Sequence, residues 1–81
     1  MELPLSALSR DERAYISRVG GRPDMVLRLK ELGFLPGTRI CCELISPAGS
    51  PVAYRVRGAL IALRKRDANM VTVTPDRERE G

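Results

Sequence analysis

The sequence predicts a mostly β fold, a small barrel of about five to six short strands with one short helix. In several short segments apolar and polar residues alternate with a period of two, which is typical of half-buried strands. Clusters of glycine and proline separate these segments, as expected for tight turns between antiparallel strands. One segment instead has apolar residues three and four positions apart, the spacing of an amphipathic helix.

The N-terminal residues contain a proline, which excludes a long helix there. We expect an irregular or short-strand segment that packs Leu5 and Leu8 on the core. After a polar turn, the pattern of residues 13–19 predicts a strand with Ala14 and Ile16 on its inner face.

Residues 20–24 end this strand and begin a helix. Pro23 suits the first helical turn, and Asp24 complements the positive end of the helix dipole. The apolar residues that share one face of this helix are Met25, Val26, Leu29 and Leu32. A helix of about two to three turns is unstable alone in water, so we expect it to pack on the strands.

The densest turn signal in the chain follows this helix. Gly33 stands where a helix C terminus favours a residue with positive φ. Pro36 fixes φ for the next turn, and Gly37 closes it. Phe34 and Leu35 are two large apolar side chains on the turn itself. We expect one of them to plug the end of the barrel, whereas one left exposed would be an anchor for a partner.

The second half of the chain is expected to form strands over residues 38–44, 52–56, 59–63 and 70–74. The inner-face residues of the first two are expected to be Ile40, Cys42, Leu44, Val52, Tyr54 and Val56. Turns containing Gly49, flanked by two prolines, and Gly58 separate these strands. A charged turn over residues 64–69, expected to be 3₁₀, precedes the last strand.

We expect residues 1–75 to form one domain and residues 76–81 to be a charged, disordered tail. A small chain of short strands and tight turns closes into a barrel, because closure removes exposed strand edges. The fold predicted is therefore a small SH3-like barrel.

The composition argues against catalysis and metal binding. The chain has no histidine, the commonest general base and metal ligand. Its carboxylates are scattered over turns and the C-terminal segment, so no nucleophile is paired with a base. We expect no enzymatic activity, no metal site and no cofactor. The longest apolar run, residues 59–63, is too short to cross a bilayer, so we expect no direct membrane insertion.

The two cysteines, Cys41 and Cys42, are adjacent. Neighbours on a strand point to opposite faces, so these thiols are not expected to bond to each other. Cys42 follows the core alternation and is expected to be a buried small hydrophobe. Whether Cys41 is reactive, or binds a metal adventitiously with Glu43, stays open. Two free thiols and the lack of a visible secretion signal favour a cytoplasmic location.

The chain is moderately basic, with a formal net charge of +4. The strongest basic cluster comprises Arg55, Arg57, Arg64, Lys65 and Arg66. Such a cluster could contact phosphates, but most charge runs are solvated surfaces, and three aromatic residues give few stacking platforms for single strands. A solvated face is favoured, and a protein partner is the next choice.

Taken together, these residues resemble the FeoA family, small cytoplasmic proteins of bacterial ferrous iron uptake. The segments that carry the resemblance are residues 28–38, 46–51, 54–58, 62–64, 67–68 and 70–73. The chain departs from the family pattern at the first turn, residues 9–12, at Leu27, and within the turn of residues 46–51.

The resemblance implies an SH3-like accessory module that docks on the ferrous iron permease FeoB, a membrane protein with a cytoplasmic GTPase domain. The expected docking surface is an apolar patch framed by arginines that orient the approach; its residues are Leu32, Phe34, Leu35, Arg55 and Arg57.

Two alternatives remain. One is a regulatory SH3-like domain related to those of iron-dependent repressors, although we expect the chain to start too close to the barrel to carry a preceding DNA-binding element. The other is a basic barrel that binds nucleic acid. The docking face, any dependence on iron or nucleotide state, and self-association are not determined by the sequence.

Overall fold

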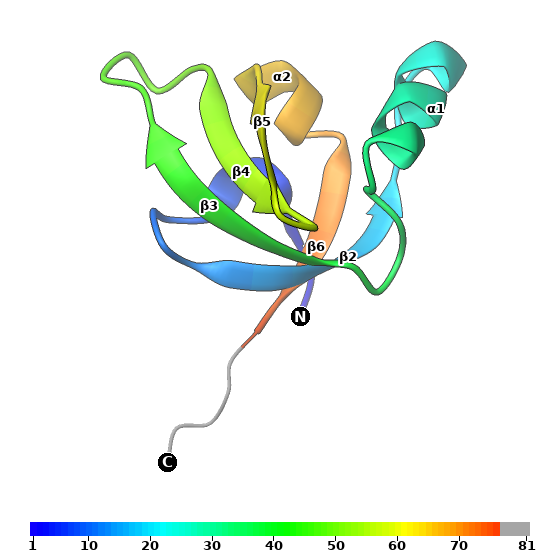
Figure 1. The fold of residues 1–81 in the computed structure, drawn as a ribbon, viewed down its shortest axis with the longest axis horizontal. Helices are drawn as coiled ribbons and strands as arrows, with labels where there is room; N and C mark the ends of the chain where they lie inside the picture. The colour runs from blue at the N-terminus through cyan, green and yellow to red at the C-terminus, as the bar shows by residue number, and fades with distance from the viewer. Residues whose placement is uncertain (77–81) are drawn as a thin grey trace.

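The structure is a computed structural model in which residues 1–76 are described, and it confirms a mostly β fold with one main helix. Six antiparallel strands form one curled sheet in the order β1-β6-β2-β3-β4-β5 (Figure 1). The elements are β1 (Leu3–Pro4), the 3₁₀ helix η1 (Leu5–Ala7), β2 (Arg13–Val19), α1 (Pro23–Glu31), β3 (Arg39–Ile45), β4 (Val52–Val56), β5 (Ala59–Leu63), α2 (Lys65–Ala68) and β6 (Val71–Pro75).

One apolar core lies inside the curl of the sheet. Its fully buried members are Leu5, Leu8, Ala14, Ile16, Leu29, Phe34, Ile40, Cys42, Val52, Tyr54, Val56, Leu63, Ala68, Val71 and Val73. No charged side chain is buried within residues 1–76, and the core includes the hydroxyl-bearing Tyr54 and the thiol-bearing Cys42. The alternation predicted for β4 is confirmed along the whole strand, and that of β2 is confirmed as far as Ile16. The register of β2 then shifts between Ile16 and Arg18, so Arg18 is exposed and Val19 packs against the core.

The prediction that Leu44 faces the core is wrong. Cys42 pairs with Tyr54 and Leu44 pairs with Ala53, so the register of β3 shifts by one residue between them. Such a bulge moves the residues beyond it to the other face of the sheet. Leu44 is therefore 54% exposed on the outer surface.

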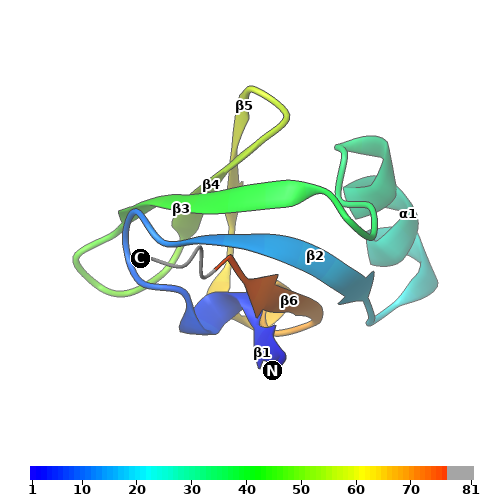
Figure 2. The same cartoon turned by 90° about the horizontal axis from the view of Figure 1, so that it is seen from below.

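The helix α1 packs less extensively than its apolar stripe predicts. Leu29 alone in this helix is fully buried, Met25 and Val26 are half-buried, and Leu32 at the C-cap is 41% exposed. Figures 1 and 2 show α1 beside one end of the sheet rather than across its face. The helix is therefore held by a narrow set of contacts.

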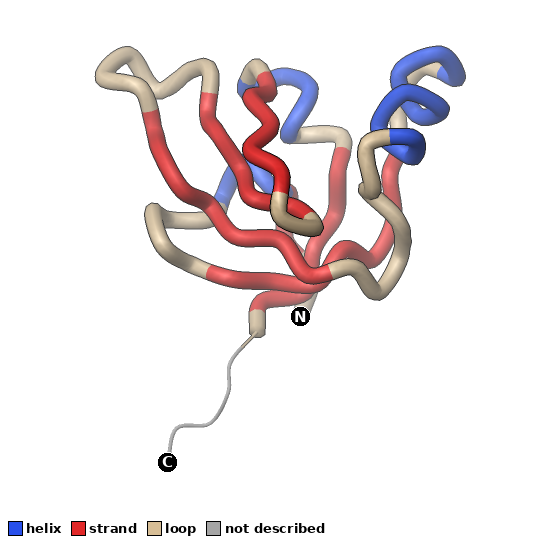
Figure 3. Tube along the Cα trace, in the orientation of Figure 1, coloured by secondary structure: helices blue, strands red, loops and turns tan. Residues whose placement is uncertain are grey.

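The C-terminal elements differ in detail from those expected. Residues 64–69 contain a short α-helix, α2, rather than a 3₁₀ turn, and the last strand runs over Val71–Pro75. The tube in Figure 3 shows α2 between β5 and β6. Asp76 belongs to the ordered structure, because its N–H donates to the Arg13 carbonyl at 2.9 Å and its carboxylate lies 2.8 Å from Arg39. The rest of the expected tail lies outside the described residues.

The barrel predicted from the sequence does not close completely. Strands β1 and β5 are the two ends of the sheet order, and they do not pair with each other. The expectation that closure removes exposed edges is therefore not met, since β1 and β5 each pair on one side only among residues 1–76.

We expect Phe34→Ala to lower the free energy of unfolding by about 3–5 kcal/mol, because it removes a fully buried aromatic side chain. Leu35→Ala, at a half-buried neighbour on the same turn, should cost no more than about 1–2 kcal/mol. Urea titration followed by circular dichroism measures both. Equal losses would contradict the assignment of Phe34 to the core, and Phe34→Leu supplies a milder variant should Phe34→Ala not fold.

Stability should also fall at high pH through Tyr54. Burial raises the pKa of the Tyr54 hydroxyl from 10.0 to about 12, so the unfolded chain ionises first. The stabilisation is fully present below pH 10 and is lost as the pH rises toward 12, by up to about 2 kcal/mol. Tyr54→Phe should flatten the unfolding free energy between these pH values relative to the wild type, whereas Tyr15→Phe should not. A Tyr54→Phe profile parallel to that of the wild type would refute this.

Candidate docking site

The turn after α1 ends the helix with a Schellman motif. The Phe34 N–H donates to the Leu29 carbonyl at 2.9 Å, and the Gly33 N–H donates to the Lys30 carbonyl at 3.0 Å. These two bonds, together with that from the Leu32 N–H to the Leu29 carbonyl at 3.0 Å, supply donors to the last carbonyls of the helix. Leu29 and Phe34 are both about 1% exposed, and an apolar pair at these two positions commonly accompanies the motif. The turn therefore anchors α1 to the core.

The same turn lies against the hairpin that joins β4 to β5. Gly33 has a φ of +103°, and a Cβ atom at this position would lie 2.8 Å from Cδ of Arg57. Arg57 and Gly58 have φ values of 52° and 84°, as a two-residue type I′ hairpin turn requires. The structure thus brings Gly33, the residue after Leu32, beside Arg57, although the two are far apart in the sequence.

The five residues expected at the docking surface are not all on one surface. Leu32 is exposed, Leu35 is half-buried, and Arg57 is exposed beside Gly33. Phe34 is inside the core, so it supports the turn and does not itself reach a partner in this conformation. The alternatives left open for the two apolar turn residues are thereby resolved: Phe34 is the core plug.

Arg55 lies on the outer face of β4. Its guanidinium is 3.1 Å from the Glu43 carboxylate on β3, and it also donates to the Gly58 carbonyl at 3.4 Å. This pair is solvent-exposed and adds little stability. Arg55 is therefore a neighbour of the hairpin, on the side of β4 that faces away from the core.

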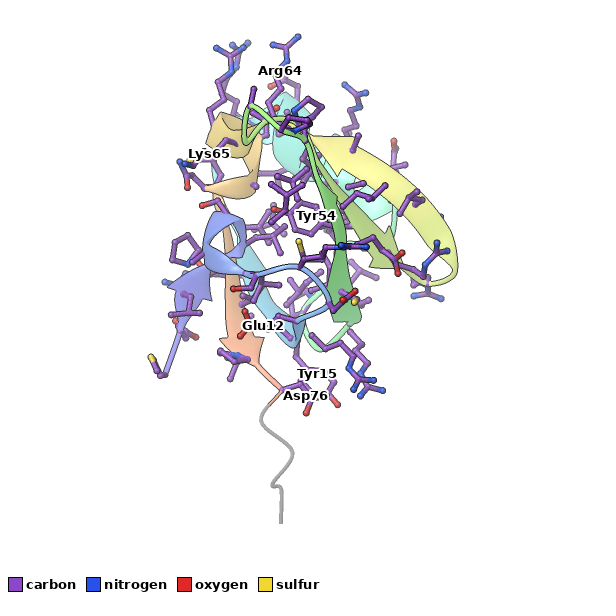
Figure 4. The ribbon with its side chains drawn as sticks, turned by 90° about the vertical axis from the view of Figure 1, so that its left-hand side faces the viewer. Glu12, Tyr15, Tyr54, Arg64, Lys65 and Asp76 are labelled. Carbon is purple, nitrogen blue, oxygen red and sulfur yellow. The ribbon has the colours of Figure 1, made fainter. Side chains whose placement is uncertain are left out.

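The basic cluster expected from the sequence is divided into two groups. Val52 pairs with Leu63 and Val56 with Ala59, so Arg57 and Arg64 lie at opposite ends of the β4–β5 hairpin, roughly 20 Å apart at 3.3 Å per residue. Figure 4 shows Arg64 and Lys65 at the top of the molecule, with Tyr54 inside it. The five basic residues do not form one continuous patch.

Sequence reasoning missed a cleft between α1 and β5. It has a volume of about 710 Å³, and its walls include Met25, Arg28 and Leu32 from α1 and Ile61 from β5. The sequence contained a signal for this cleft, namely the apolar stripe of α1. The stripe has several apolar residues, but Leu29 is the one residue of α1 that is fully buried in the core. Apolar side chains left over from core packing commonly mark a binding surface.

The thiols are not activated. Burial is the main cause that raises the pKa of both Cys41 and Cys42, and a reactive thiol needs a lowered pKa. Both cysteines are free, with Cys42 buried as predicted and Cys41 half-buried. Residues 1–76 contain no group of three potential metal ligands in position to hold an ion.

The fold matches that of a known class of small β domains. FeoA of Stenotrophomonas maltophilia, a prokaryotic SH3 domain protein solved with zinc, superposes with a TM-score of 0.76 at 30% identity over 90% of this chain and 88% of that one. The curled six-stranded sheet is thus SH3-like, as predicted. FeoA of Chlorobium tepidum superposes with a TM-score of 0.90 at 29% identity, covering 98% of this chain and 75% of that one.

The family itself follows from the sequence match. The FeoA domain profile matches residues 3–75, nearly the whole described chain, and the chain belongs to the FeoA family, a family of accessory domains of ferrous iron transport. A fusion protein of Fe(2+) transport protein A and the Fe(2+) transporter FeoB from Porphyromonas gingivalis is 36% identical over 69 residues. That match covers 85% of this chain but 8% of the fusion protein.

We expect substitution of Gly33 to displace Arg57. Gly33→Ala and Gly37→Ala both place a side chain at positive φ, which costs on the order of 1–3 kcal/mol, but only Gly33→Ala meets another atom within 4 Å. Gly33→Ala should therefore destabilise more than Gly37→Ala in urea titrations. In an Arg57→Ala background this excess should vanish. Persistence of the excess would show that Arg57 is not in contact with the turn.

Proposed function

We propose that this chain is a non-enzymatic, cytoplasmic accessory module of bacterial ferrous iron uptake that docks on the cytoplasmic part of a FeoB permease. The observation that carries the proposal is the Porphyromonas gingivalis relative, in which a homologous segment is fused to FeoB in one polypeptide. Fusion of two domains keeps them at high effective concentration, so it favours partners that associate. Membership of the FeoA family supports the same role.

The surface proposed for docking centres on the turn after α1. Leu32 is 41% exposed and Leu35 is half-buried, so both offer apolar area at the surface. Arg57 lies against Gly33 of this turn, and Arg55, two residues earlier on β4, donates to the Gly58 carbonyl of the same hairpin turn. Leucines form the apolar centre of the contact, and the arginines orient an acidic partner and speed its approach.

The features of this chain fit a binding role better than a catalytic one. The pKa values of both thiols, the half-buried Cys41 and the buried Cys42, are raised mainly by burial, and the core holds no charged group among the described residues. No helix within residues 1–76 is long and apolar enough to cross a membrane. The cytoplasmic location is proposed because a protein that docks on the cytoplasmic domain of a permease must itself be in the cytoplasm.

We do not favour nucleic acid as the partner. Phosphate binding needs several cations within reach of one backbone, and here Arg57 and Arg64 lie at opposite ends of a hairpin. The related regulatory role in an iron-dependent repressor would require a partner DNA-binding element, and the fusion to FeoB points to transport instead.

The test is equilibrium binding of the purified chain to the soluble cytoplasmic domain of the permease from the same source. Leu32→Asp should weaken binding at least about tenfold, because a charge replaces apolar contact area in the proposed interface. Leu27→Asp is the matched control: Leu27 is 56% exposed on the same helix but lies outside the cleft, and this change should alter affinity less than about twofold.

Charge reversal tests the arginines in the same assay. Arg57→Glu and Arg55→Glu should each slow association, because they remove cations that steer an acidic surface. If the wild type binds but neither Leu32→Asp nor Arg57→Glu weakens capture of a folded protein, the proposed surface is wrong. If the wild type does not bind the permease domain at all, the docking proposal itself fails.

A further inference from the structure

The two free edges of the sheet are protected very differently. β1 has two residues and contains Pro4, and a short, proline-bearing edge does not accept another strand readily. β5 has five residues, Ala59–Leu63, with no charge and no proline. Leu60 is 50% exposed on it. The β5 edge thus lacks the usual devices by which soluble proteins prevent strand addition.

The hairpin geometry identifies which backbone groups of β5 are free. Arg57 and Gly58 form a two-residue turn, so Val56 and Ala59 are the hydrogen-bonded pair that closes it. Hydrogen-bonded and non-hydrogen-bonded pairs alternate along an antiparallel ladder. The N–H and C=O groups of Leu60 and Ala62 therefore point away from β4, toward the free edge. Two residues with outward-facing backbone groups are enough to pair with an added strand, because β1 pairs with β6 through two residues.

The cleft between β5 and α1 lies along this edge. Ile61 and Ala62 line it from the strand, while Met25 and Leu29 line it from the helix and Leu32 from the C-cap of the helix. Figure 1 shows β5 and α1, the two elements that carry these residues. A cleft of about 710 Å³ is within the range of sites that enclose drug-sized ligands, which corresponds to a few residues of extended peptide. An added strand would place alternate side chains against this apolar floor.

The polar lining of the cleft is predominantly cationic. Its charged residues are four arginines and two aspartates: Arg22, Arg28, Arg64, Arg66, Asp24 and Asp67. Asp24 lies 3.5 Å from Arg22 and is paired with it. The surplus of arginines favours an occupant with negative charge, because complementary charges steer and orient association.

We propose that the free edge of β5 binds an extended, acidic segment of a partner protein by strand addition, in the cleft between β5 and α1. This inference rests on the proposed docking to a permease, and it specifies the conformation and charge of the docked segment. Backbone hydrogen bonds from Leu60 and Ala62 supply affinity, and the apolar floor and the arginines supply specificity.

The charge pattern disfavours a second copy of this chain as the occupant. In an antiparallel pair of β5 strands, the hairpin turn that carries Arg57 in one copy would approach Arg64 and Lys65 at the start of α2 in the other. Like charges placed opposite each other across strands are destabilising. The cations that flank β5 at both ends therefore act against self-pairing and in favour of a segment with acidic flanks.

The backbone test uses one position and two substitutions. Ala62→Pro removes an N–H that faces outward, which an edge strand tolerates, whereas Ala62→Ser keeps that N–H. Affinity for the permease cytoplasmic domain should fall at least about tenfold with Ala62→Pro and change less than about twofold with Ala62→Ser. Thermal unfolding must show that both variants are folded; Leu60→Pro, which removes the other outward N–H, replaces Ala62→Pro if the latter is not.

The charge test uses two neighbouring positions on α1. Arg28 lines the cleft, while Lys30 is exposed on the same helix outside it. Arg28→Glu should weaken binding at least about tenfold, and Lys30→Glu should leave it within about twofold of the wild type. Equal binding by wild type, Ala62→Pro and Arg28→Glu would overturn strand addition while leaving docking on the permease intact.

A peptide assay separates this inference from the docking proposal. The probe is a synthetic octapeptide with alternating valine and threonine at its centre and two glutamates at each end; its counterpart carries lysines in place of the glutamates. The acidic peptide should bind the wild type and lose binding with Ala62→Pro, and the lysine peptide should bind at least about tenfold more weakly. The inference is overturned if neither the permease domain nor the acidic peptide binds at the edge, or if sedimentation shows a wild-type dimer that Ala62→Pro dissociates.

Discussion

The arrangement of this domain depends on one apolar contact, that of Phe34 with the core at the end of α1. The Schellman bonds from Gly33 and Phe34 end the helix in the geometry that buries Phe34 next to Leu29. The helix has few other buried groups, so this contact largely determines where α1 stands. Because Gly33 also lies against Arg57, the same turn fixes the distance between α1 and the β4–β5 hairpin. That distance sets the width of the cleft between α1 and β5.

Regular alternation is what made most of the fold predictable. In β4 and in β2 as far as Ile16, the apolar residues at every second position are buried, because successive side chains of a pleated strand point to opposite faces. Leu44 breaks the rule because a bulge depends on pairing with β4, which the sequence of β3 does not encode locally. The helical stripe of α1 predicted a helix correctly, but the stripe alone did not show that Leu32 would remain exposed.

The site was harder to predict than the fold, for a physical reason. Whether a turn residue such as Phe34 is buried depends on where the turn packs in the folded chain. Turn residues follow no helical or strand periodicity, so the sequence pattern does not distinguish a buried Phe34 from an exposed one. The basic residues show that closeness in the sequence does not mean closeness in the fold. Arg57 and Arg64 are seven positions apart in the sequence, yet hairpin pairing places them at opposite ends of β5. The cleft joins α1 to β5, elements separated in the chain by two strands, so no local pattern could reveal it.

The incomplete closure of the sheet connects these observations to binding. A fully closed barrel would satisfy every strand edge and leave no template for a partner. Here α1 occupies the space beyond β5 without covering the strand, because its single deep anchor at Leu29 holds it at one end of the sheet. Leu32, Met25 and Ile61 consequently remain around an open cleft rather than joining the core. Moving α1 onto β5 would bury these side chains, but it would also cover β5, the longer of the two edge strands within residues 1–76.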